Sequence, residues 1–397
     1  MSTERVPLWL DCDPGHDDTF AILLAAYHPQ IELLGISTVH GNASLDKTTN
    51  NALSVLTAIG KEKEITVYPG AAKALYRPPI HAPTDIHGES GLDGTTLLPK
   101  PAATADTSTS AVDAMAAALR AQPAGKAWLI ATGAVTNVGA LILAHPDLAE
   151  HVAGVSIMGG AIGNKFTAAP LGVVDGVERI GNWTPWAEFN ILIDPEAAQV
   201  VFGNPVLAAK TTLIPLDLTH LVLATQEVQA DLLYGADAAG EKKATEDIAE
   251  AYKTTGIKGK TDLRTMLVEL LNFFAGTYRD VFGIIEGPPL HDPLAVAIAL
   301  IGTASEIPFY DFDPASPEGP QRRERFDLAV VTEGTLAEAQ AKDSKVQTGR
   351  TVAKLLEPGK PGVRIPRGLD IPLFWKVIEE CCQRADEANA ARAAGRQ

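Results

Sequence analysis

Short apolar runs alternate with helical runs from residue 6 to residue 158 of the chain. The runs typical of buried strands are Val6 to Leu10, Leu33 to Val39, Ile65 to Tyr68, Ala127 to Ala131 and Val152 to Met158. The helical runs are residues 19–26, 47–59, 110–121 and 137–144. This alternation predicts βαβ units, and therefore an α/β fold with an open, mainly parallel twisted sheet flanked by helices.

Polar or glycine-containing groups follow several of these predicted strands. They are Asp13, Asn42, Thr132-Gly133 and Met158-Gly159-Gly160. Open α/β sheets bind their ligands at the carboxyl ends of the strands. The recurrence therefore indicates one shared site at one edge of the sheet.

Three segments depart from the alternation. Residues 76–94 are rich in Pro, Gly and His and could form a lid over the site. Residues 227–260 are polar and helical in parts, with glycine breaks, and are expected to be a helical insertion. Residues 385–397 are rich in Ala and Arg and are expected to fray. Since no linker divides the chain convincingly, we expect one domain over residues 1–397.

Composition excludes several classes of function. The 397 residues are 46% hydrophobic, which is enough for a substantial core. A formal net charge of −16 argues against nucleic acid or an anionic membrane as a partner. Cys12, Cys381 and Cys382 resemble neither a disulfide framework nor a zinc site. With no long apolar run for a signal peptide or membrane span, we expect a cytoplasmic protein.

Four aspartates lie within eight residues, in the run DCDPGHDD. They are Asp11, Asp13, Asp17 and Asp18, placed between the first predicted strand and the first helix. Ionised carboxylates at this density repel one another and are costly without a cation. Hard oxygen ligands suit Ca²⁺ or Mg²⁺. A metal site is therefore the favoured interpretation, and a solvated acidic turn is the alternative.

Two further polar clusters lie later in the chain. Asn182, Glu188 and Asn190 lie close to aromatic residues in GNWTPWAEFN, which suits a sugar, although Asn in a turn often caps backbone groups instead. His291 and Asp292 precede an apolar helix over residues 294–300. Asp292 is a possible further metal ligand. His291 is the best acid–base candidate because histidine titrates near neutrality, although a lone histidine before a helix is more often structural.

Taken together, these motifs resemble the nucleoside hydrolase family, the inosine–uridine-preferring ribohydrolases. The matching segments, in chain order, are DCDPGHDD, VHGN, HGESGLDG, ATGAVTNVG, MGG, AEFNILIDPEAA, IPLDLTH and PLHDPLAVA. They extend from about Leu8 to Trp375. The resemblance implies a Rossmann-like core with the nucleoside hydrolase fold, and a Ca²⁺ ion as cofactor. It also implies a ribonucleoside as the small-molecule partner and a homodimer or homotetramer.

The resemblance also implies a role for individual residues. The metal ligands would be Asp13, Asp18, the carbonyl oxygen of Thr132, and Asp292. Asp17 and Asn190 would hold the ribose 2′- and 3′-hydroxyls. The other substrate-binding positions would be Asn42, His87, Met158, Asn182, Glu188 and Phe189. Asp11 matches a buried carboxylate that supports the site without touching the metal.

The expected reaction is hydrolysis of an N-glycosidic bond, which builds positive charge on the ribose. A divalent cation lowers the pKa of the attacking water, and Asp13 can accept its proton. His291 would assist the departing base. A metal-dependent phosphohydrolase or glycosyltransferase is disfavoured because few basic residues follow the strands. A non-catalytic nucleoside-binding protein is the other alternative, although binding alone needs no base such as Asp13.

Overall fold

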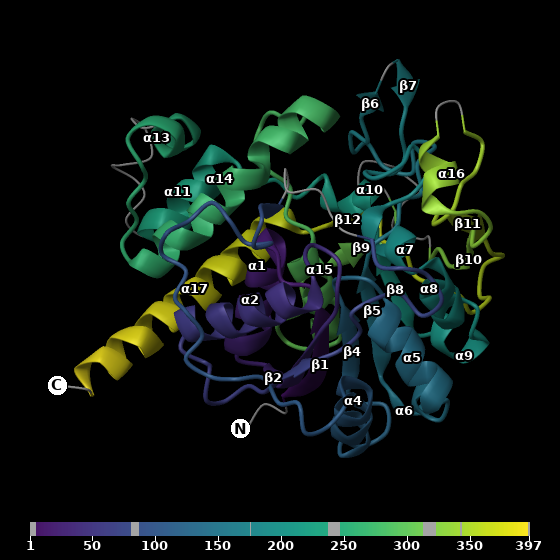
Figure 1. The fold of residues 1–397 in the computed structure, drawn as a ribbon, viewed down its shortest axis with the longest axis horizontal. Coiled ribbons are helices and arrows are strands. Elements are labelled where there is room, and N and C mark those ends of the chain that lie inside the picture. Colours follow the sequence, from purple (N-terminus) through teal and green to yellow (C-terminus); the bar gives the residue numbers. More distant parts are fainter. Residues whose placement is uncertain are drawn as a thin grey trace.

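The computed structural model describes residues 5–80, 87–174, 176–236, 247–312, 323–341 and 344–395. A six-stranded sheet with the strand order β3-β2-β1-β4-β5-β8 lies at its centre (Figure 1). Every neighbouring pair in this sheet is parallel. Its strands are β1 (Val6–Cys12), β2 (Ile31–Thr38), β3 (Val67–Pro69), β4 (Trp128–Ala131), β5 (Gly154–Met158) and β8 (Thr211–Ile214).

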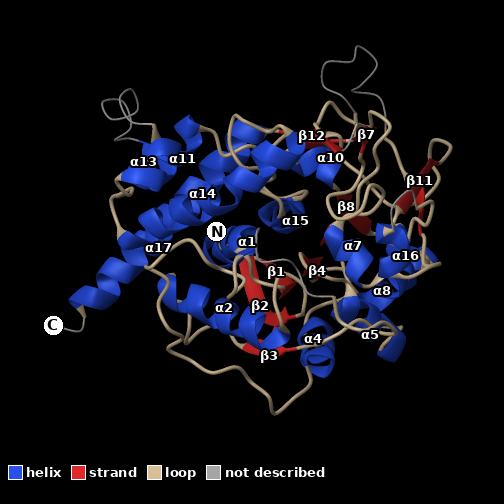
Figure 2. Cartoon of the chain, turned by 45° about the horizontal axis from the view of Figure 1, so that its top comes forward, coloured by secondary structure: helices blue, strands red, loops and turns tan. Residues whose placement is uncertain are grey.

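Helices cover both faces of this sheet (Figure 2). The helices whose side chains join the same core as Leu8, Leu10 and Cys12 are α1 (His16–Tyr27), α2 (Leu45–Ala58), α11 (Gln226–Tyr234), α13 (Ile248–Thr254), α14 (Asp262–Phe282), α15 (Asp292–Ala297) and α17 (Ile371–Ala394). Those packed around Trp9 are α4 (Ala111–Arg120), α5 (Thr136–Ala144), α6 (Leu148–His151), α8 (Pro195–Phe202) and α9 (Pro205–Ala208). The two cores follow from the alternation of side chains along β1.

The strand order places a topological switch point between β1 and β4. The chain proceeds from β1 to β2 and β3 on one side, and then from β4 to β5 and β8 on the other. The loops after β1 and β4 therefore leave in opposite directions and open a crevice at the carboxyl edge, where such sheets bind ligands. Asp13 and Thr132 follow these two strands directly. The predicted open parallel α/β sheet is confirmed.

Smaller elements complete the described structure. The paired strands are β6 (Val173–Val174) with β7 (Val177–Glu178), β9 (Phe309–Tyr310) with β12 (Gly368–Leu369), and β10 (Phe326–Val330) with β11 (Thr351–Leu355). The remaining helices are α7 (Phe189–Ile193), α10 (Leu216–Thr219), η2 (Ile298–Leu300) and α16 (Leu336–Gln340). Among the described residues, no helix is both long and apolar enough to cross a membrane.

Residues 385–394, part of the tail expected to fray, continue α17 as helix. Asn389 donates a hydrogen bond of 2.8 Å to the Ala58 carbonyl oxygen, and Arg392 pairs with the buried Glu62. Composition alone indicated fraying, but this docking against the end of α2 holds the last turns of α17.

The other two unusual segments are partly described. Residues 87–94 form a turn anchored on α2, where Asn51 donates to the Ser90 carbonyl oxygen at 3.0 Å. Residues 81–86 lie outside the described residues, so the lid stays a prediction. The expected insertion over 227–260 contains most of α11 and the whole of α13. Residues 237–246 of that insertion are outside the described part of the chain.

Candidate active site

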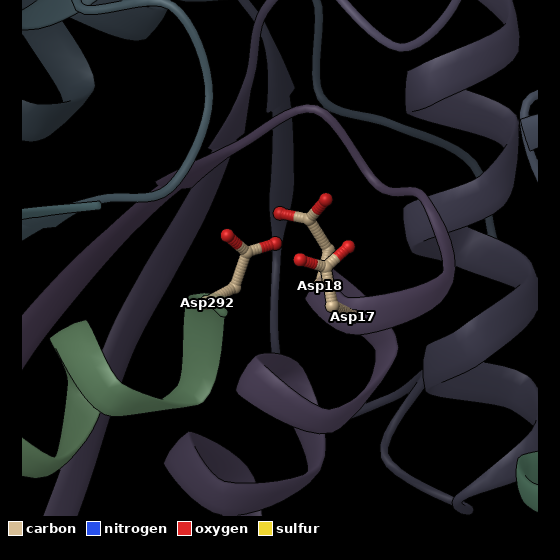
Figure 3. Close-up of side chains that lie close together, drawn as sticks. All are labelled: Asp17, Asp18 and Asp292. Atoms are coloured by element: carbon tan, nitrogen blue, oxygen red, sulfur yellow. The ribbon is translucent and has the colours of Figure 1, made fainter. Parts of the chain in front are cut away.

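Three buried carboxylates meet where α1 and α15 begin (Figure 3). Asp17 and Asp18 lie in the first turn of α1, and Asp292 is the first residue of α15. One oxygen from each lies within 4.8 Å of the others, and none of the three residues is more than 8% exposed. The grouping follows from packing, because α1 and α15 lie side by side. The predicted metal ligands included Asp13, whereas the observed group of three carboxylates contains Asp17 in its place.

Asp13 lies beside this group, just after β1. Its Oδ2 accepts a hydrogen bond of 2.8 Å from the Asn42 backbone N–H, and its Oδ1 is buried without a partner among the described residues. Gly41 and Gly133 approach the carboxylate so closely that a Cβ on either would lie 2.0 and 2.5 Å from its oxygens. Only glycine leaves room for the carboxylate at these two positions. The backbone therefore fixes the position of the Asp13 carboxylate and leaves its Oδ1 without a hydrogen bond from a described residue.

Asp18 and Thr132 connect β4 to the acidic group. The Thr132 hydroxyl donates to Asp18 Oδ1 at 2.8 Å, and the Gly15 backbone N–H donates to Asp18 Oδ2 at 3.0 Å. The Thr132 carbonyl oxygen accepts a hydrogen bond of 2.8 Å from Asn190 Nδ2. The predicted carbonyl ligand is therefore at the site, and it already contacts one of the predicted ribose residues.

The Asp11 side chain points to the face of β1 that is covered by α5, and it lies beneath the site. Its Oδ1 accepts hydrogen bonds from the Ser37 hydroxyl and, at 2.7 Å, from Asn137 Nδ2 of α5. Its Oδ2 is buried without a partner in the described residues. Burial raises the pKa of Asp11 to about 7. The prediction that Asp11 supports the site from below agrees with this position.

Burial and mutual repulsion make the acidic group unfavourable in its ionised form. Burial, followed by repulsion from Asp18, raises the pKa of Asp17 to about 7 and that of Asp13 well above its usual range. Burial and then Asp17 raise the pKa of Asp292 well above its usual range. A site of buried carboxylates with an orphaned oxygen fits a hard divalent cation, which would supply the missing positive charge.

A cavity opens beside the carboxylates, and Asp17 and Asp292 form part of its lining. Its lining includes all the predicted substrate-binding residues together with three that the prediction did not assign, Trp183, Leu216 and Tyr278. The full lining is Asp17, Asn42, His87, Thr132, Met158, Asn182, Trp183, Glu188, Phe189, Asn190, Leu216, Tyr278, His291 and Asp292. Among the residues that the structure describes, no Lys or Arg belongs to this lining. The cavity thus combines aromatic surface with amide and carboxylate groups.

The wall formed by α7 uses its polar groups for capping as well as lining. Glu188 is the N-cap of α7, and its oxygens accept backbone N–H groups of Asn190, Ile191 and Gly160 at 2.8, 3.1 and 2.8 Å. Asn182 Oδ1 accepts the Phe189 backbone N–H at 2.9 Å. The capping alternative is therefore correct for these contacts, and the same side chains still face the cavity.

His291 lies in the cavity wall with both ring nitrogens engaged. Nε2 is 2.7 Å from the Tyr278 hydroxyl, and Nδ1 is 2.7 Å from the Thr219 hydroxyl. Burial, followed by the neighbouring His220, lowers the pKa of His291 well below its usual range. A neutral His291 bonded to Tyr278 is therefore the resting arrangement. Tyr278 was missed because it lies inside the amphipathic helix α14, where a tyrosine gives no sequence signal.

His87 enters the cavity from the turn at residues 87–94 and contacts a second histidine. Its Nδ1 lies 2.8 Å from Nδ1 of His16, a fully buried residue in the first turn of α1. His16 Nε2 lies 2.7 Å from the Asp93 carbonyl oxygen. The only sequence signal for this contact was a histidine within DCDPGHDD, and its partner is 71 residues away.

The fold and the site define an α/β protein with an acidic site below a small-molecule cavity. Comparison with known proteins narrows this class. The family model for inosine–uridine-preferring nucleoside hydrolases matches residues 8–376, and the chain belongs to this family. It is therefore a nucleoside N-ribohydrolase, as the sequence motifs predicted.

Relatives and solved structures agree with this membership. The uridine nucleosidase of Saccharomyces cerevisiae is 37% identical over 98% of this chain and 99% of the relative. A pyrimidine-specific ribonucleoside hydrolase of Salmonella arizonae is 40% identical over 74% of this chain and 78% of the relative. The purine-preferring ribonucleoside hydrolase from Gardnerella vaginalis shares the fold, with a TM-score of 0.68 at 24% identity, covering 96% of this chain and 99% of that one.

Proposed function

We propose that the protein hydrolyses ribonucleosides to ribose and free base in a Ca²⁺-dependent reaction. The observation that carries this proposal is the group of buried carboxylates at the switch point of the sheet, two of which line a cavity rich in amide and aromatic side chains. Carboxylates and amides at the bottom of the cavity suit ribose hydroxyls, and aromatic walls suit a planar base.

Asp18 and Asp292 are the residues best placed to hold the cation, with Asp13 and the Thr132 carbonyl oxygen completing the oxygen set. Asp17 lies within the same carboxylate group, so it is a further candidate ligand. Ca²⁺ suits this set because it takes six to eight oxygen ligands in flexible geometry. When bound, such an ion lowers the pKa of a coordinated water and neutralises the carboxylates.

Asp13 is proposed to accept the proton of the attacking water. Its Oδ1 is the free oxygen, while Oδ2 is fixed by the Asn42 backbone N–H. This arrangement leaves one lone-pair-bearing oxygen without a hydrogen bond from a described residue and restrains the carboxylate from rotating. A group positioned in this way meets the geometric requirement for a general base.

The ribose would be held by polar side chains on opposite sides of the cavity. Asp17 lies on α1 and Asn190 lies on α7, so residues from two helices would bind the ribose 2′- and 3′-hydroxyls. Asn182 and Glu188 would face the 5′-hydroxyl, with Asn42 beside the attacking water. Met158 and Phe189 supply apolar contact for the sugar. A site that bonds both hydroxyls discriminates against a 2′-deoxyribose.

Departure of the base is proposed to be assisted by His291 through Tyr278. The bond of 2.7 Å between His291 Nε2 and the Tyr278 hydroxyl makes Tyr278 the neighbour through which His291 acts. A proton or hydrogen bond from this pair would stabilise the base as it takes up the glycosidic electrons. The lowered pKa of His291 leaves the ring neutral, so His291 Nε2–H can donate to the Tyr278 oxygen while the Tyr278 hydroxyl donates a hydrogen bond to the base.

A panel of nucleosides tests the proposal. Inosine, uridine, cytidine, adenosine and nicotinamide riboside would be incubated with Ca²⁺-loaded protein, and reducing sugar, free base and phosphate released from nucleotides would be measured. Release of ribose and base in equal amounts is the expected result. Phosphate release would favour the phosphohydrolase alternative, and unchanged nucleoside bound to the protein would favour the binding alternative. The lining without Lys or Arg disfavours phosphate substrates.

Two further expectations accompany this function. The printed names of relatives include a uridine nucleosidase and a pyrimidine-specific hydrolase, which supports a pyrimidine ribonucleoside among the substrates. A cytoplasmic location is supported by three buried cysteines without disulfides. The homodimer or homotetramer stays a prediction, to be tested by light scattering.

A further inference from the structure

Helix α7, which carries Asn190, ends at a buried carboxylate that lies outside the cavity lining. Asp194 is both the C-cap of α7 and the N-cap of α8, and it is fully buried. Its Oδ1 accepts the Ala197 backbone N–H at 3.0 Å. Its Oδ2 accepts the Leu75 backbone N–H at 2.7 Å and the Thr136 hydroxyl at 2.8 Å. Asp194 therefore joins the end of α7 to α8, to α5 and to the chain that follows β3.

Two hydrogen bonds connect α7 and Asp194 to the chain that leaves β4 and begins α5. Inside the cavity, Asn190 Nδ2 donates to the Thr132 carbonyl oxygen at 2.8 Å. Four residues further along each segment, and away from the cavity, the Thr136 hydroxyl donates to Asp194. The buried outer bond therefore sets the spacing at which the inner bond, between two residues of the lining, can form.

Close packing around these bonds leaves little freedom. A Cβ on Gly139 of α5 would lie 2.8 Å from the Cβ of Ala197 on α8, so the two helices approach this closely because residue 139 is glycine. Phe189 and Ile193 of α7 share a small buried apolar cluster with Ala134. Apolar contacts thus press α7 onto the residues after β4, and Asp194 adds the directional bonds that fix where α7 ends.

We propose that Asp194 is a positioning residue that holds Asn190 at the place where it binds the ribose. The inference rests on the proposed ribonucleoside hydrolysis, in which Asn190 bonds a secondary hydroxyl of the sugar. Asp194 acts through the bond between Asn190 and Thr132, because its own carboxylate is fully engaged by buried donors. Without these bonds, α7 is free to shift from the residues after β4, and the Asn190 amide leaves its place.

Two substitutions weaken the anchoring of α7 to different degrees. Thr136→Val removes the donating hydroxyl with little change of shape, and Asp194 keeps two backbone N–H donors. Asp194→Asn is more severe, because either orientation of the amide turns its NH₂ group toward a backbone N–H, that of Leu75 or that of Ala197. The milder variant keeps the inference testable if the severe one does not fold.

Glu196→Gln is the matched control for a general loosening of α8. Glu196 lies in the first turn of α8, as close to its start as Ala197, but it pairs with Arg77 at 2.6 Å and not with a described residue of α5. All three substitutions would be made in the wild type and in Asn190→Ala. The measured quantity is kcat/KM for uridine at saturating Ca²⁺.

The two backgrounds separate positioning of Asn190 from a general effect on the fold. In the wild-type background, Thr136→Val should lower kcat/KM roughly tenfold and Asp194→Asn roughly 10- to 100-fold, the effect of losing one hydrogen bond or of leaving a buried donor unpaired. In Asn190→Ala, where the amide to be positioned is absent, both losses should shrink to about twofold. Glu196→Gln should cause the same change in both backgrounds.

Equal losses in the two backgrounds for Thr136→Val and Asp194→Asn would overturn the inference, because Asp194 would then stabilise the fold without acting through Asn190. Turnover near that of the wild type in both variants would overturn it as well.

Hydrogen exchange of α7 tests the inference without any turnover. The backbone N–H groups of Asn190 and Ile191 are bonded to the Glu188 carboxylate, and mass spectrometry of a peptide spanning residues 188–194 reports their opening. We expect exchange roughly tenfold faster in Thr136→Val and Asp194→Asn than in the wild type, and unchanged in Glu196→Gln. Unchanged exchange in the first two variants would refute the inference even if uridine is hydrolysed. Faster exchange, in a protein whose wild type cleaves no nucleoside, would support the anchoring of α7 and would instead refute the proposed function.

Discussion

Removal of the metal should make the stability of the protein depend steeply on pH. In the metal-free protein, burial raises the pKa values of Asp11 and Asp17 from the usual value of about 3.8 to about 7. A group whose folded pKa is raised contributes stability below its unfolded pKa and loses that contribution as pH rises through the folded pKa. The stability that these two carboxyls contribute to the metal-free protein should therefore be lost between about pH 4 and pH 7.

The size of the effect follows from these shifts. Each pKa unit corresponds to about 1.4 kcal/mol, so a shift of about three units contributes up to about 4 kcal/mol for each carboxyl. Two such groups give a slope of about 2.7 kcal/mol per pH unit between pH 5 and pH 6. Bound Ca²⁺ would keep the carboxylates of its site ionised and so remove most of the contribution of Asp17.

Urea denaturation, followed by the fluorescence of the five tryptophans, measures this effect. Unfolding free energies would be compared at pH 5, 6 and 7 in chelator and in excess Ca²⁺. Asp11→Asn is the matched variant, because it removes one buried titrating group that lies below the proposed metal ligands. It should lower the slope in chelator by about 1.4 kcal/mol per pH unit. The same slope with and without Ca²⁺, or the same slope in chelator for wild type and Asp11→Asn, would refute the reasoning.

Other outcomes follow from the same site and from one structural ion pair. Turnover of 2′-deoxyuridine should fall roughly up to 10⁴-fold below that of uridine, because a missing hydroxyl leaves polar groups of the site unpaired, and comparable rates would contradict this. His291→Ala should lose about 10²–10⁴-fold on uridine but far less on p-nitrophenyl riboside, whose leaving group needs little help, whereas equal losses would mean a structural role. Arg264→Leu should destabilise the fold by about 3–5 kcal/mol in urea denaturation, because fully buried Arg264 pairs with Asp386 at 2.6 Å. An unchanged midpoint would rule this out.

The sequence revealed the parts of the site whose residues are close together in the chain. DCDPGHDD places its carboxylates after a strand and in the first turn of a helix, so local structure alone brings them to one place. Asp292 was a possible further ligand from its own residues, and the family resemblance then placed it with these carboxylates. The observed group of three carboxylates contains Asp17, which had been expected to bind ribose. Asp17 belongs to the group because α1 packs against α15 with both Asp17 and Asp18 facing Asp292.

Parts of the structure that depend on packing between distant elements could not be predicted. Tyr278 reaches the cavity only because α14 lies across it, and its hydroxyl meets His291. The contact between His16 and His87 depends on a turn 71 residues away. The end of α17 is held by Asn389 at α2, which composition does not show. Tertiary contacts overrode local propensity in each case.

The substitution Asp13→Asn tests the central claim most directly. The amide keeps the shape of the side chain and can still offer one oxygen, but it cannot accept a proton from water. Release of uracil and ribose from uridine would be measured for wild type and variant, with the metal content and the unfolding midpoint determined in the same samples. The account predicts a loss of about 10²–10⁴-fold in kcat with the fold and metal retained. Near-normal turnover in a metal-loaded, folded variant would contradict it.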